Sequence, residues 1–153
     1  MRILVVCTGN TCRSPLGEAV LRAEAARQGI ELEVGSAGTA AYDGAPASEG
    51  SYLVALEHGL DLSAHRARSV TRALVDEADL VLTMSRRHLQ RVRDLGGETK
   101  SHLFAEYAPA GDGGAEIPDP VGQGIEAYRE THARLAELAV NVVSRLRRER
   151  GGT

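Results

Sequence analysis

The chain is organised around the stretch Cys7-Thr8-Gly9-Asn10-Thr11-Cys12-Arg13-Ser14-Pro15. The apolar run that precedes it, residues 3–6, is typical of a buried strand. Ser14 is a candidate helix N-cap, and Pro15 suits the first helical position. The sequence therefore predicts a strand, a short loop and a helix N-terminus in immediate succession.

This loop carries the groups needed to bind an oxyanion. A loop that closes on a helix N-terminus points backbone N–H groups inward, and the helix dipole favours an anion there. Arg13 would hold a phosphate-like group bidentately. The same field would stabilise the thiolate of Cys7 as a nucleophile, with a further hydrogen bond from the Ser14 hydroxyl. The alternative is a buried Cys7 that acts as a small hydrophobic residue, with Arg13 on a solvated helix start.

The pattern C-x-G-N-x-C-R-S-P, placed after an N-terminal strand and opening a helix, resembles the phosphate loop of the low-molecular-weight protein tyrosine phosphatase family. The resemblance covers essentially the whole chain and implies phosphorylated proteins as substrates. It implies that Cys7 and Arg13 are catalytic. It also implies that phosphate is bound by the loop residues Thr8, Gly9, Asn10, Thr11, Cys12, Arg13 and Ser14.

A thiolate that displaces a phosphoryl group leaves a product that needs a proton, so a general acid is expected. The Pro- and Gly-rich residues 105–122 offer Asp112, Glu116 and Asp119. Asp119 stands between two prolines, which restrict its backbone, and the family carries its acid in a D-P pair at this distance from the C-terminus. We expect Asp119 to protonate the leaving group and then to activate water. The alternative is that Pro-Asp-Pro is only a turn.

Three positions depart from the tyrosine phosphatase pattern. Thr11 replaces an aliphatic residue, Val121 replaces an aromatic residue after the D-P pair, and Ser85 replaces an acidic residue. Thr11 resembles the branch that removes phosphate from arginine side chains, whereas Tyr42 could still supply a ring for a phenol. We therefore expect Thr11, Tyr42 and Val121 to set selectivity, with a preference for phosphoarginine over phosphotyrosine.

Cys12 has two interpretations: it packs under the loop, or it forms a disulfide with Cys7 after oxidation, which family precedent favours. Two rival functions remain. An arsenate reductase of the same fold would need further cysteines downstream, and the sequence has none after Cys12. A non-catalytic phosphate-binding module would need neither Cys7 nor Asp119.

Composition bounds the remaining classes. The length of 153 residues suits a single domain, 1–153, and the net charge of -3 gives no basic field for nucleic acid or membrane. Two cysteines and five scattered histidines form no zinc pattern, and we expect no metal or cofactor, because Arg13 and the loop amides carry the phosphate charge. The histidines are interpreted as surface or packing residues. No signal peptide is apparent, so we expect a cytoplasmic protein. We also expect it to be a monomer.

Periodicity predicts strands over 2–6, 31–36, 79–84 and 100–104, and helices from Ser14 to 28 and over 46–58, 72–77, 86–95 and 125–148. This alternation predicts an α/β fold of three layers. Its four-stranded parallel sheet has the flavodoxin-like order 2-1-3-4, with helices on both faces. Ligands bind outside the carboxyl ends of such strands, where Cys7 falls. The resemblance implies that the basic segment 65–68 supports the phosphate loop, and the alternative is a solvated run of charge.

Overall fold

The computed structural model describes residues 1–111 and 114–151. The strands are β1 (Arg2–Cys7), β2 (Glu33–Gly38), β3 (Leu80–Thr83) and β4 (Ser101–Leu103). The helices are α1 (Arg13–Gln28), α2 (Glu49–Glu57), α3 (Arg72–Glu77), α4 (Arg86–Val92), the short π-helical segment η1 (Arg93–Gly97), α5 (Phe104–Tyr107) and α6 (Ile125–Gly151).

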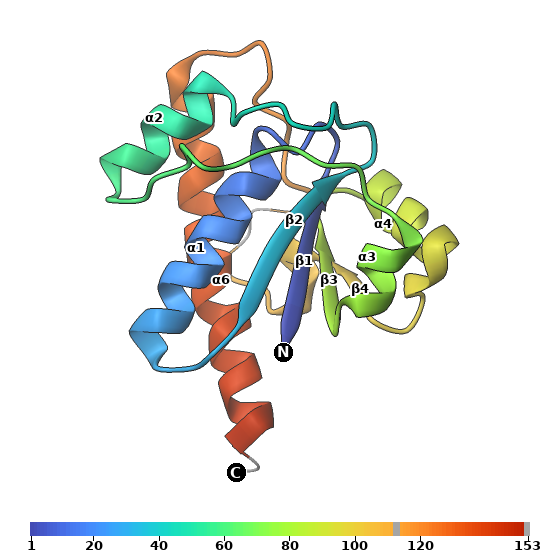
Figure 1. Cartoon of the computed structure of the whole chain (residues 1–153). Coiled ribbons are helices and arrows are strands. Elements are labelled where there is room, and N and C mark those ends of the chain that lie inside the picture. The colour runs from blue at the N-terminus through green and yellow to red at the C-terminus, as the bar shows by residue number, and fades with distance from the viewer. Residues whose placement is uncertain (112–113, 152–153) are drawn as a thin grey trace.

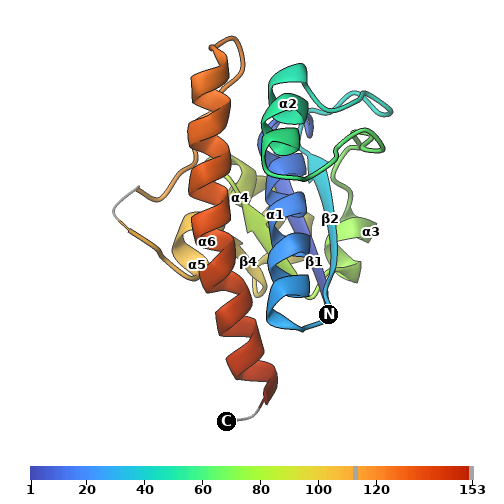
Figure 2. The same cartoon turned by 90° about the vertical axis from the view of Figure 1, so that its left-hand side faces the viewer.

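The four strands form one parallel sheet in the order β2-β1-β3-β4, so the predicted fold class and strand order are confirmed. Helices cover both faces: α1 and α6 run side by side on one face, and α3 and α4 lie on the other (Figures 1 and 2). In the register, Cys7 at the end of β1 stands beside Gly38 at the end of β2. The carboxyl ends of the two strands therefore meet where the phosphate loop begins.

The core follows from the alternation of side chains along β1. Ile3 and Val5 pack into the larger cluster, with α1 and α6, whereas Leu4 and Val6 pack into the smaller one, with α3. A strand buried on both faces reads as a continuous apolar run, which explains residues 3–6. The predicted apolar face of α6 is buried as expected at Leu135, Leu138, Ala139, Val142 and Leu146.

Several predicted boundaries were wrong by a few residues. The first helix begins at Arg13 with Cys12 as its N-cap, so Ser14 is not the cap. The second begins at Glu49, where the Ser48 side chain accepts from Ser51 N. The fourth strand ends at Leu103, and α5 occupies the start of the stretch expected to be loop. None of the helices described is long and apolar enough to span a bilayer.

Candidate active site

The phosphate loop connects β1 to α1 at the carboxyl edge of the sheet (Figure 1). The N–H groups of residues 9–12 donate to no protein acceptor among residues 1–111 and 114–151. These donors precede the N-terminus of a 16-residue helix, whose dipole favours negative charge. An anion in front of this helix would therefore find N–H groups that no described protein atom occupies.

Asn10 fixes the shape of this loop. It has a φ of 57°, a left-handed conformation that asparagine tolerates better than most residues. Its Nδ2 donates to Ser14 Oγ (2.7 Å) and Ser36 Oγ (2.9 Å), and its Oδ1 accepts from Arg68 N (3.0 Å). Its carbonyl oxygen lies 2.6 Å from His65 Nε2. The segment 65–68 thus supports the phosphate loop, as one of its two interpretations held.

The end of β2 holds the other side of the loop. Thr39 N donates to Cys7 O and Ala40 N donates to Thr8 O, each at 2.9 Å. A Cβ atom on Gly38 would lie 2.4 Å from the carbonyl oxygen of Thr8, closer than real side chains come. Glycine is therefore required at position 38 for β2 to approach the loop this closely.

Cys7 lies at the base of the loop with only 2% of its surface exposed. Its Sγ lies 3.0 Å from Ser14 Oγ and accepts from Ser14 N at 3.4 Å. Because Asn10 already donates to the Ser14 oxygen, the serine proton is free to point at the sulfur. Two donors thus converge on the Cys7 sulfur, and hydrogen bonds of this kind are stronger to a charged acceptor than to a neutral one. The buried Ser14 hydroxyl therefore bonds to the sulfur and does not cap the helix.

Arg13 is buried as well, with 5% of its surface exposed. Its NH1 donates to Ile117 O at 2.9 Å, and its NH2 donates to Thr8 Oγ1 at 3.3 Å. Its Nε is buried and has no hydrogen-bond partner among the described residues. A buried guanidinium donor without a partner is costly, and an oxyanion on the loop would accept from it.

Asp119 is the carboxylate that lies beside this arginine. Its Oδ2 is 3.7 Å from Arg13 NH2, and its Oδ1 accepts from Val121 N at 3.0 Å. Of the other two candidate acids, Glu116 is engaged elsewhere, because its Oε2 accepts from Arg86 N at 2.8 Å. Asp112 lies outside the described residues. The structure therefore brings Asp119, but not Glu116, to the rim of the phosphate loop.

Cys12 packs in a cluster with Val54 and Tyr128, whereas Cys7 packs in the larger core cluster. Its Sγ donates to Ser48 Oγ at 3.3 Å and lies 3.8 Å from the Tyr128 hydroxyl, whose pKa is raised chiefly by burial. Both cysteines are free thiols. Ser48 and Tyr128 were missed in the sequence because they lie 36 and 116 residues away and no local pattern connects them to the motif.

The three candidate selectivity residues differ in setting. Thr11 is half-buried, and its carbonyl oxygen accepts from Ser48 N at 2.9 Å, which ties the loop to the start of α2. Tyr42 is 87% exposed and Val121 is 59% exposed. Both are surface side chains, whereas Thr11 is part of the phosphate loop itself.

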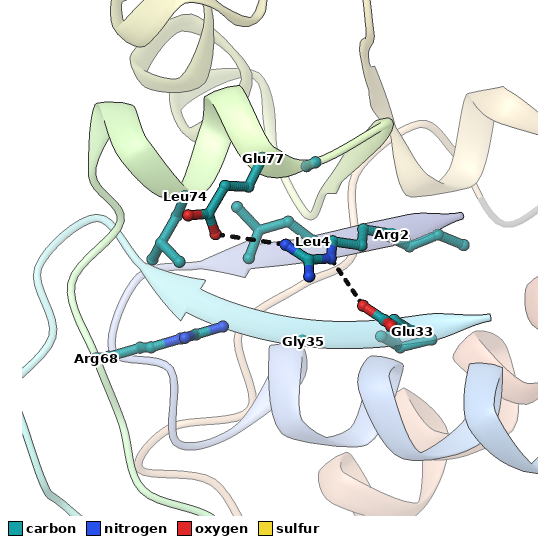
Figure 3. Close-up of a pocket in the computed structure, with 10 residues that line it drawn as sticks. Arg2, Leu4, Glu33, Gly35, Arg68, Leu74 and Glu77 are labelled. Atoms are coloured by element: carbon teal, nitrogen blue, oxygen red, sulfur yellow. Dashed lines mark hydrogen bonds and ion pairs between the residues drawn. The ribbon is translucent and has the colours of Figure 1, made fainter.

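A separate cavity of about 220 Å³ lies between β1, β2 and α3, lined in part by Arg2 and Arg68 (Figure 3). Arg2 Nε lies 2.7 Å from Glu33 Oε2, and Arg2 NH1 lies 3.8 Å from Glu77 Oε2. These residues start their strands or end α3, so the cavity lies toward the amino end of the sheet, away from Cys7. Arg2 is paired with two carboxylates, and Arg68 Nε donates to Ser36 O at 2.9 Å, so two charged side chains of this cavity are already engaged.

The fold and the carboxyl edge of its sheet are those of an α/β phosphatase. The chain matches the model of the family "low molecular weight phosphotyrosine protein phosphatase" over residues 2–151. The protein belongs to this family and is a phosphatase.

Its relatives include both tyrosine and arginine phosphatases. It is 34% identical to the protein-arginine-phosphatase of Bacillus subtilis (strain 168), over 98% of this chain and 99% of that protein. It is 39% identical to the low molecular weight protein-tyrosine-phosphatase Wzb of Escherichia coli (strain K12), over 90% of this chain and 89% of that protein. A solved structure of the arginine phosphatase YwlE, a cysteine-to-serine mutant with a phosphorylated active-site serine, superposes with a TM-score of 0.91 at 33% identity, covering 99% of both chains.

Proposed function

We propose that the protein hydrolyses phosphorylated protein side chains through a phosphoryl group carried on Cys7, with Arg13 as the phosphate-binding residue and Asp119 as the acid and base. The observation that carries this proposal is the convergence of Ser14 Oγ and Ser14 N on the Cys7 sulfur, together with a buried Arg13 Nε that has no hydrogen-bond partner among the described residues. The phosphorylated active-site serine in the YwlE mutant supports a covalent intermediate in the family.

In the first step, the Cys7 thiolate attacks phosphorus and forms an S–P bond. The bond from phosphorus to the side-chain oxygen or nitrogen breaks, and the Asp119 carboxyl donates its proton to that leaving atom. The charge that develops on the phosphoryl oxygens is met by Arg13 and the N–H groups of residues 9–12. Asp119 lies 3.7 Å from Arg13, which suits a group that works at the edge of the bound phosphoryl group.

In the second step, the Asp119 carboxylate takes a proton from water, and the water oxygen attacks phosphorus. The S–P bond breaks, inorganic phosphate is formed, and the sulfur leaves as a thiolate. The two donors on Ser14 stabilise that leaving thiolate as they stabilised the attacking one.

We further propose that phosphoarginine is preferred over phosphotyrosine, with phosphotyrosine as a slower substrate. A phenol presents an apolar ring, which favours an aliphatic neighbour, whereas a guanidinium presents N–H donors that the Thr11 hydroxyl can accept. A hydroxyl left unpaired against a ring costs about 1–3 kcal/mol, or roughly 5–150-fold in selectivity. Val121 supports the same preference, because it supplies no aromatic ring to stack on a phenol, an interaction that contributes about 0.5–1.5 kcal/mol.

The test is the ratio of kcat/KM on a phosphotyrosine peptide to that on a phosphoarginine peptide. Thr11→Ile should raise this ratio at least tenfold, an effect on the order of one hydrogen bond. Thr11→Val, which removes only the hydroxyl, should raise it similarly, and Thr11→Ser, which keeps the hydroxyl, should leave it within about threefold of the wild type. If the isoleucine and valine variants leave the ratio unchanged, Thr11 does not set the substrate.

A further inference from the structure

His88 on α4 is only 4% exposed, yet both of its ring nitrogens meet hydroxyl groups. Its Nδ1 lies 3.0 Å from Ser85 Oγ, and its Nε2 lies 2.8 Å from Thr8 Oγ1. The second contact joins α4 to the phosphate loop across 80 residues of sequence. A histidine that is only packing needs no such contact, so its place beside the loop calls for an explanation.

The direction of this contact depends on the tautomer of His88, and we assign the tautomer in which Nε2 accepts. Thr8 Oγ1 accepts from Arg13 NH2 at 3.3 Å, and a guanidinium can only donate. The hydroxyl keeps its own proton for a second bond, and an unprotonated Nε2 of His88 accepts it. The remaining ring proton is then on Nδ1 and faces Ser85 Oγ. Arginine, threonine and histidine thus form one chain of hydrogen bonds that ends on α4.

The chain requires a neutral imidazole, and the surroundings favour one. Burial, followed by the positive charges of Arg13 and Arg87, lowers the pKa of His88 to about 4, against an opposing effect of Asp119 and Glu116. The ring is therefore neutral at physiological pH, and Nε2 can accept from Thr8.

Arg13 NH2 has two acceptors in competition. The Thr8 hydroxyl lies 3.3 Å from this nitrogen, and Asp119 Oδ2 lies 3.7 Å from it. A carboxylate is the stronger acceptor for a guanidinium, so an unsupported hydroxyl would lose the arginine to Asp119. A hydroxyl whose proton is held by His88 keeps its lone pair turned toward Arg13.

We propose that His88 is a positioning residue for phosphoryl transfer: it holds the Thr8 hydroxyl, and through it sets the orientation of the Arg13 guanidinium at the phosphate loop. This inference rests on the proposed function, in which Arg13 binds the phosphoryl group. His88 acts through Thr8 and is not itself placed on the substrate.

The test is a double-mutant cycle between His88→Leu, which removes both hydrogen bonds of the ring, and Thr8→Val, which removes only the hydroxyl. Two quantities are measured: kcat/KM with p-nitrophenyl phosphate, and the dissociation constant of inorganic phosphate by calorimetry. Each single variant should lose about tenfold or more in kcat/KM and bind phosphate more weakly, the size of one hydrogen bond to a charged group. The double variant should match the less active single variant in kcat/KM and phosphate affinity, within about twofold, because both changes break the same chain of hydrogen bonds.

His88→Gln places an amide oxygen near the position of Nε2 and should recover most of the loss, which a purely structural role would not produce. It also completes the cycle with Thr8→Val if the leucine variant does not fold. Additive losses in the double variant, or phosphate affinity unchanged in every His88 variant, would overturn the proposal. Phosphate binding reports Arg13 without turnover, so absent turnover in the wild-type protein would count against the proposed function alone.

Discussion

Ser14→Ala isolates one hydrogen bond at the nucleophile. The change removes the hydroxyl that lies 3.0 Å from Cys7 Sγ but keeps the Ser14 N–H, which donates to the same sulfur. Ser14 is fully buried and Cys7 nearly so, so no water can take the place of the hydroxyl. Asn10 Nδ2 loses one acceptor but keeps Ser36 Oγ at 2.9 Å, so we expect the loop to hold its shape.

A hydrogen bond to a charged group contributes about 1.5–3 kcal/mol, which corresponds to roughly 10- to 150-fold in rate. We therefore expect kcat/KM on p-nitrophenyl phosphate to fall by that factor. The rate at which the neutral reagent iodoacetamide alkylates Cys7 at neutral pH should fall too, because less thiolate is present. The alkylation rate is measured without phosphate, so it reports the thiol rather than substrate binding.

Ser51→Ala is the matched control. Ser51 is also a fully buried serine near the loop, and its Oγ donates to Cys12 O at 3.0 Å without reaching Cys7. We expect this variant to lose some stability but to keep kcat/KM and the alkylation rate within about threefold of the wild type. If Ser14→Ala behaves like Ser51→Ala in both assays, the hydroxyl does not stabilise the thiolate.

Three further predictions concern Asp119, Cys12 and the buried His132 of α6. Asp119→Ala should lower kcat/KM, which reports the first step, by roughly 10²–10⁴ on a substrate with a poor leaving group and by less on p-nitrophenyl phosphate, and an equal loss on both would indicate a structural role. After exposure to peroxide, the wild-type protein should regain activity with a thiol reductant, whereas Cys12→Ser should not; equal recovery would leave Cys12 with packing alone. Burial, followed by the charge of His58, lowers the pKa of His132 to about 4, so the neutral ring is favoured in the folded state. That stability is present above about pH 6.5 and is lost as the pH falls toward 4, by at most about 3 kcal/mol. Urea unfolding should show a smaller loss for His132→Phe across this window, and an equal loss would contradict the burial effect.

The sheet could be predicted from the sequence because its signals are local. Residues 3–6 form a continuous apolar run, and the helix–strand alternation that follows allows few parallel arrangements. The predicted start of α1 was wrong for a physical reason. A serine before a proline is typical of an N-cap, but Ser14 is buried and its hydroxyl faces Cys7. The Ser14 hydroxyl therefore contacts Cys7 instead of capping the helix.

The residues that the structure brings together at the loop could be predicted as far as the motif extends along the chain. Cys7 and Arg13 lie within seven residues of each other, and prolines mark Asp119, so local pattern was sufficient. His88 was interpreted as surface or packing, because its partner Thr8 is 80 residues away and nothing in the spacing of histidines points to a hydroxyl. Contacts of this kind appear only when the sheet brings α4 beside the phosphate loop.

The most direct test of the account is to look for the phosphoryl group on Cys7. Asp119→Ala should form the intermediate from p-nitrophenyl phosphate, because p-nitrophenolate leaves readily without a proton. It should hydrolyse the intermediate slowly, because it lacks the base. Rapid mixing followed by mass spectrometry should then find one phosphoryl group on the peptide that contains Cys7, and none in the same peptide of the double variant Cys7→Ala/Asp119→Ala. A phosphoryl group on another residue, or continued turnover in Cys7→Ala, would contradict the account.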